Sequence, residues 1–124
     1  MARPPRLSLA EFEKLVEKAI GELPELFRSR LDNVVIAVED EPTDEDYELT
    51  GTPDDEDLFG IFRGPMRTEM SWDMLPTLPP QAVVFRGPIL RNTSSNREAV
   101  KEIKETLVHE LGHYFGLEDD EMPV

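Results

Sequence analysis

The segment from His109 to Asp119, HELGHYFGLED, constrains this chain more than any other part of its sequence. It contains both histidines of the protein, His109 and His113, with Glu110 between them. Residues four apart on an α-helix leave it from the same face, so both imidazoles are expected to point one way. Two neutral imidazoles placed like this can bind one Zn²⁺, while the neighbouring glutamate stays free to act as a base. The segment therefore predicts a metal site on one face of a helix.

A third metal ligand is expected just beyond that helix. Gly116 follows His113 by three residues and is suited to ending the helix and turning the chain. Asp119 comes three residues later, where the turn would bring its carboxylate back towards the metal. Glu118 and Asp120 are alternatives, but the spacing of the pattern favours Asp119. The predicted zinc ligands are therefore His109, His113 and Asp119, and the predicted catalytic base is Glu110.

The motif falls within the last expected helix. Ser95 is expected to cap this helix, with Glu98 completing a capping box. The two histidines project roughly opposite the apolar stripe, beside Glu102 and Thr106, which either support the metal or are solvated surface residues. The alternative to a metal site is a pair of solvated histidines on an exposed helix face. The apolar stripe consists of Val100, Ile103, Leu107, Leu111 and Tyr114.

An N-terminal helix and several short strands precede the motif. Ser8 and Glu11 form the capping box of the first helix, and a short helical piece is expected at residues 24–30. The β-branched run at residues 33–39 predicts a strand buried on both faces. Further strands are expected at residues 58–63 and 82–86, the latter closed by Gly87 and Pro88, with another short strand near residues 67–71.

Residues 39–57 form an acidic segment, with 11 carboxylates among 19 residues. Such a run repels itself and buries little apolar surface, so it is expected to be a solvated, flexible loop. Calcium binding is the alternative function for this segment. The segment lacks the regular ligand alternation and the glycine of an EF-hand loop, which disfavours calcium.

Composition limits the classes of protein to which the chain can belong. Its 124 residues predict one domain over residues 1–124. The net charge of −14 argues against nucleic acids and anionic membranes as partners, and any peptide substrate is expected to be neutral or basic. There is no cysteine, no secretion signal and no apolar run long enough to span a membrane, so a cytoplasmic location is expected.

The motif residues resemble the zincin metallopeptidases, and among them the small, single-domain family described as minimal zincins. The match rests on His109-Glu110-Leu111-Gly112-His113 with Gly116 and Asp119. Weaker support comes from residues 85–89, FRGPI, just before the final helix. The resemblance implies an α+β fold: a small mixed sheet of about four strands packed with an N-terminal helix and a C-terminal motif helix. It also implies an edge strand that binds extended peptide.

The resemblance implies a zinc-dependent peptidase that acts on a peptide or protein substrate. A metal-activated water would attack the peptide bond, with Glu110 as general base. The alternative is a metal- or peptide-binding module of the same fold with little or no hydrolysis. Only five residues follow Asp119, so the methionine turn of larger relatives is not expected here, and the cleft should be shallow and open.

Overall fold

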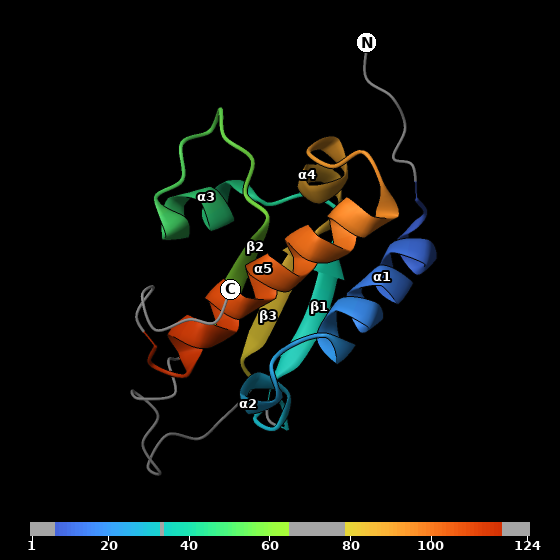
Figure 1. Ribbon diagram of the computed structural model, residues 1–124. Helices are drawn as coiled ribbons and strands as arrows, with labels where there is room; N and C mark the ends of the chain where they lie inside the picture. The colour runs from blue at the N-terminus through green and yellow to red at the C-terminus, as the bar shows by residue number, and fades with distance from the viewer. Residues whose placement is uncertain (1–6, 33, 65–78, 118–124) are drawn as a thin grey trace.

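The protein is built from five helices and three strands in the described part of the chain. The computed structural model describes residues 7–32, 34–64 and 79–117. Within these ranges no helix combines the length and apolar character that crossing a membrane requires. The architecture is mixed α+β, as expected (Figure 1). In chain order the elements are α1 (Leu9–Gly21), α2 (Glu25–Arg28), β1 (Val35–Glu39), α3 (Asp44–Thr50), β2 (Gly60–Arg63), β3 (Gln81–Phe85), α4 (Arg86–Arg91) and α5 (Asn96–Tyr114).

The three strands form one mixed sheet in the order β1-β3-β2. β1 runs parallel to the central strand, with Val35 opposite Gln81, and β2 runs antiparallel to it, with Gly60 opposite Val84. The expected mixed sheet is therefore confirmed, with three strands among the described residues. The additional strand expected near residues 67–71 lies outside them.

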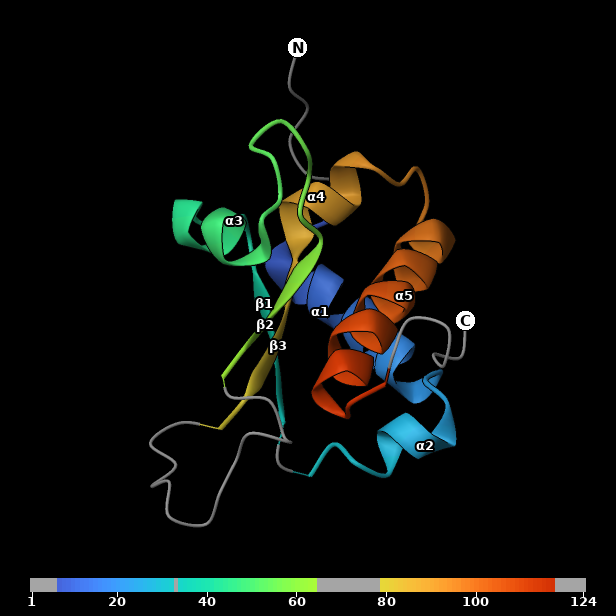
Figure 2. The ribbon, with the colours of Figure 1, turned by 90° about the vertical axis from the view of Figure 1, so that its left-hand side faces the viewer.

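The main core lies between one face of this sheet and the helices α1 and α5. These two helices pack against each other on the same side of the sheet (Figure 2). A smaller buried cluster, formed by Ile61, Val83 and Phe85, occupies the other face, because successive residues of a strand point to opposite sides. The largest fully buried side chains of the main core are Phe12, Phe27, Ile89, Ile103, Leu107 and Leu111.

The capping box predicted for α1 is fully formed, and the one predicted for α5 is formed only in part. At α1 the Ser8 hydroxyl accepts from the Glu11 N–H at 3.1 Å, and the Glu11 carboxylate accepts from the Ser8 N–H at 2.8 Å. At α5 the Ser95 hydroxyl accepts from the Glu98 N–H at 3.1 Å. The Glu98 carboxylate, however, accepts from the hydroxyls of Ser94 and Ser95. The expected capping box of α5 is therefore only half formed.

The prediction that the first strand is buried on both faces is wrong. β1 is an edge strand, its residues Ile36 to Glu39 are only half-buried, and Val35 is 40% exposed. The most buried of the described strands is β3, which lies between the other two and is buried from Ala82 to Phe85. A β-branched run marks a strand, but its place within the sheet depends on the pairing of distant segments.

The acidic segment at residues 39–57 contains helix α3, where only a loop was expected. Thr43 caps this helix by accepting from the Asp46 N–H at 3.2 Å, and the Asp46 carboxylate accepts from the Thr43 N–H at 2.9 Å. Asp46 is only 2% exposed, and Arg63 of β2 donates to both of its carboxylate oxygens, at 2.9 and 3.0 Å. The cap at Thr43 and the salt bridge with Arg63 thus stabilise a helix in a segment whose acidic composition had indicated a solvated loop.

Gly87 and Pro88 do not close the third strand as a turn. They lie in the first turn of α4, which begins directly after β3, and the Gly87 N–H donates to the Asp40 carbonyl at 2.9 Å. Proline is tolerated in a first helical turn because its missing N–H has no helical partner there. α4 carries the chain from the end of the sheet to the start of α5.

Candidate metal centre

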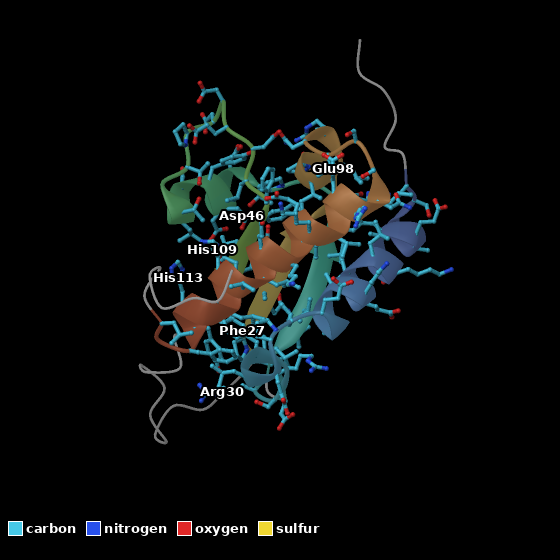
Figure 3. All side chains as sticks on the ribbon, in the orientation of Figure 1. Phe27, Arg30, Asp46, Glu98, His109 and His113 are labelled. Atoms are coloured by element: carbon cyan, nitrogen blue, oxygen red, sulfur yellow. The ribbon has the colours of Figure 1, made fainter. Side chains whose placement is uncertain are left out.

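Helix α5 has a buried face and a face that carries the histidines. All five residues of the predicted apolar stripe are buried, including Tyr114, whose ring stacks on that of Phe62 with centroids 4.7 Å apart. His109 and His113 are both exposed, and they leave α5 on the side away from α1 (Figure 3). The predicted split between an anchored face and a histidine face is therefore confirmed.

The ring of His109 is oriented by its own helix. Its Nδ1 atom lies 3.1 Å from the backbone carbonyl oxygen of Glu105, one turn earlier. A carbonyl can only accept a hydrogen bond, so Nδ1 carries the proton and donates it. When the ring is neutral, the lone pair is therefore on Nε2. Metal-ligating histidines are commonly fixed in this way by a second hydrogen bond.

The two imidazoles lie near each other on the exposed face of α5. Their ring centroids are 6.5 Å apart and the ring planes are inclined by 78°. Two imidazoles on one tetrahedral zinc have ring centres roughly 5 Å apart. The side chains of His109 and His113 are both exposed. The donor set, two imidazole rings with a carboxylate next to them, is the chemistry that zinc takes in catalytic sites.

Glu110 lies beside the histidines and is half-buried in a groove. The groove has a volume of about 340 Å³ and runs between α5 and the chain that enters β2. Burial raises the pKa of the Glu110 carboxyl above its usual range, and the charges of His113 and His109 partly oppose this rise. A carboxylate with a raised pKa holds a proton more readily, which suits a general base. The groove is lined by Leu58, Phe59, Gly60, Glu102, Glu105, Thr106, His109, Glu110 and His113.

Gly60 allows β2 to approach the motif helix closely. A Cβ atom at this position would lie 2.5 Å from the Thr106 methyl carbon, 2.8 Å from the Val83 carbonyl oxygen and 3.8 Å from the Glu110 Cγ atom. Any side chain would therefore push the strand away from α5. This close contact places the start of β2 alongside the histidine face.

The end of α5 turns as the sequence predicts. Gly116 has φ +85°, the left-handed conformation that glycine adopts most easily. The Leu117 N–H donates to the Gly112 carbonyl at 2.8 Å, and the Gly116 N–H donates to the His113 carbonyl at 3.0 Å. This pair of bonds is the Schellman motif, which ends a helix and redirects the chain.

The structure brings three of the four predicted site residues into one groove: His109, Glu110 and His113. Asp119 and its alternatives Glu118 and Asp120 lie outside the described residues. Within the described ranges there is accordingly no group of three or more His, Cys, Asp or Glu side chains arranged to hold a metal.

Sequence reasoning missed two parts of the groove wall. Glu105 lines the groove one turn before His109, and this spacing was a signal that could have identified it. Residues 58–60 form the opposite wall, and no local pattern links them to α5. Glu102 and Thr106, expected on the histidine side, also line the groove and are half-buried.

The chain is similar to known proteins over most of its length. A family model described as zincin-like metallopeptidase matches residues 31–123, a range that includes the whole motif and Asp119. A solved structure of a conserved hypothetical protein from T. thermophilus aligns with a TM-score of 0.58 and 22% identity, over 88% of this chain and 94% of that one. At this identity the likeness concerns the fold alone. No curated protein matches the chain.

Proposed function

We propose that this chain, which belongs to the zincin-like metallopeptidase family, is a zinc-dependent peptidase. The main support is the arrangement of three side chains on α5. His109 and His113 are exposed one turn apart, and Glu110 is half-buried beside them in a groove. The family is one in which such a set of residues commonly holds a catalytic zinc.

The zinc ligands in this proposal are His109 and His113 through their ring nitrogens and Asp119 through its carboxylate. The hydrogen bond from His109 Nδ1 to the Glu105 carbonyl supports Nε2 as the ligand atom of that ring. The Schellman turn at Gly116 supports Asp119, because it redirects the chain immediately after the helix. A zinc ion held by these residues would lower the pKa of a bound water to about 7 and polarise the scissile carbonyl.

Glu110 is the general base of the proposed reaction. It accepts the proton of the attacking water and passes it to the nitrogen of the leaving amine. Its partial burial and its raised pKa support this role, because a carboxylate that holds a proton more readily is the better base. The expected contribution of a positioned base is about 10²- to 10⁴-fold in rate.

The proposed substrate is a peptide in extended conformation. β2 is an edge strand of the sheet among the described residues, and the residues that enter it, 58–60, form one wall of the groove. An extended peptide added along this edge would gain backbone hydrogen bonds and lie across the histidine face. The cysteine-free composition supports a cytoplasmic location as part of the same proposal.

A comparison of peptide cleavage by zinc-loaded wild type and Glu110→Gln tests this function. Glutamine keeps the size of the side chain and removes the base, so cleavage should fall by about 10²- to 10⁴-fold while bound zinc is retained. Glu17→Gln, an exposed position on α1, is the matched control and should cleave like wild type. Zinc retention without cleavage by the wild type would favour the binding module instead.

A further inference from the structure

The groove beside the candidate metal centre is strongly acidic. Three of its lining residues are glutamates, Glu102, Glu105 and Glu110, and no lysine or arginine is among the described residues that line it. Glu105 and Glu102 belong to the same wall as the histidines, one and two turns before His109, respectively. Glu110 is the general base of the proposed reaction, whereas Glu102 and Glu105 have no role in it.

Glu102 and Glu105 have no salt-bridge partner within the described part of the protein. No ion pair there joins either carboxylate to a lysine or arginine, although other acidic residues, such as Glu39 and Glu41, have arginine partners. Burial raises the pKa of Glu102, and the charge of Glu105 raises it further, while Lys101 opposes the rise. Holding two carboxylates together at a half-buried wall is unfavourable, and a bound cation would relieve it.

The positions of these carboxylates along α5 determine which residues of a bound peptide would lie next to them. With a rise of 1.5 Å per residue, Glu105 and Glu102 lie about 6 Å and about 10 Å before His109 along the helix axis. An extended peptide advances about 3.3 Å per residue. A peptide that places its scissile bond beside the histidines would therefore bring side chains about two and about three residues away to the two glutamates.

We propose that Glu102 and Glu105 select substrates that carry a lysine or arginine about two or three residues from the bond that is cleaved. This inference rests on the proposed peptidase function and assigns its substrate class. The opposite wall, residues 58–60, is formed by two apolar side chains and a glycine, so the charge of the groove comes from α5 alone. A glutamate in the same substrate position would face two like charges and be disfavoured.

Cleavage of matched peptides by the zinc-loaded protein tests the inference. The probes are internally quenched peptides with one common scissile bond and Lys, Ala or Glu two or three residues from it, on either side. Wild type should have a kcat/KM at least about tenfold higher for the best lysine peptide than for its glutamate counterpart. The Glu102→Gln/Glu105→Gln variant should reduce this ratio to within about twofold.

Glu13→Gln/Glu17→Gln is the matched control, because it removes the same two charges from exposed positions on α1. It should keep the wild-type preference for lysine. Glutamine preserves the size of both groove side chains and leaves the Glu105 carbonyl that accepts from His109 in place. Far-UV circular dichroism should therefore be the same for wild type and both double variants. A wild type without charge preference, or a preference of equal size in both double variants, would overturn the inference.

Measurements of peptide binding test the charge preference independently of peptide cleavage. The affinity of zinc-loaded Glu110→Gln for fluorescently labelled lysine and glutamate peptides is measured by anisotropy at low and high ionic strength. The lysine peptide should bind more tightly, lose affinity as salt increases, and lose its advantage when Glu102 and Glu105 are also replaced. This pattern without wild-type cleavage would refute only the peptidase proposal. Equal binding of both peptides would refute the charge selection even if cleavage occurs.

Discussion

The backbone of Gly60 and the methyl group of Thr106 meet so closely that a Cβ on the glycine would lie 2.5 Å from the methyl carbon. This contact lies between β2, an edge strand among the described residues, and the histidine face of α5, and both of its residues line the groove. A substitution at Gly60 therefore acts on stability and on the site together.

Gly60→Ala should destabilise the protein by about 1–3 kcal/mol, since the added methyl group also meets the Val83 carbonyl at 2.8 Å. Urea unfolding measures this loss. Gly21→Ala is the matched control, because nothing lies within 4 Å of the position of its Cβ. It should be neutral or slightly stabilising, as helical alanine is favoured over glycine. Similar stabilities for the two variants would contradict the close contact.

Asp46 should make stability depend on acid pH. Burial raises the pKa of this carboxyl, but hydrogen bonds from the Thr43 backbone and the Arg63 guanidinium lower it more, so its folded value is below the usual one. A carboxyl with a lowered folded pKa stabilises the protein above its unfolded pKa and loses that contribution as pH falls. The loss should begin below about pH 4.

Asp46→Asn should cost about 1–3 kcal/mol at neutral pH, because Arg63 loses a charged partner at a site that is almost fully buried. The difference in unfolding free energy between wild type and variant should shrink as pH falls below about 4. Chemical unfolding at a series of pH values measures it. The exposed Asp55→Asn serves as control. A difference that stays constant with pH would show that the charge of Asp46 is not the cause.

Asp119 should be the acidic residue that holds the metal with the histidines. Asp119→Ala should weaken zinc binding by at least about 100-fold, because a three-ligand site would be left with two. Glu118→Ala and Asp120→Ala remove a similar charge at the neighbouring positions and should change affinity only a few-fold. Competition with a chromophoric chelator gives the three affinities. A larger loss for either neighbour would move the third ligand to that residue.

Local patterns predicted the parts of the molecule that depend on local interactions. The periodic stripe from Val100 to Tyr114 placed α5 and its histidine face correctly, and Gly116 marked the turn that ends it. These features follow from helix geometry and from the conformational freedom of one glycine. The family match over residues 31–123 agrees with the resemblance that the motif suggested.

Features that depend on distant residues were predicted less well. The run at residues 33–39 contains strand β1 (Val35–Glu39), but among the described strands pairing made β3 the buried centre and left β1 at an edge. Helix α3 had a local sequence signal in its cap residues, Thr43 and Asp46. The salt bridge between Arg63 and Asp46 had no such signal, because the two residues are far apart in the sequence. The wall of the groove at residues 58–60 likewise results from tertiary packing of β2 against α5.

Metal analysis of the purified protein tests the central proposal most directly. Wild type and Glu110→Gln, equilibrated with zinc at neutral pH and then freed of unbound metal, should each retain about one zinc ion per chain. His113→Ala should retain almost none, because only one imidazole remains on the exposed face of α5. A wild type without zinc, or a His113→Ala variant that retains as much as wild type, would contradict the metal centre proposed here.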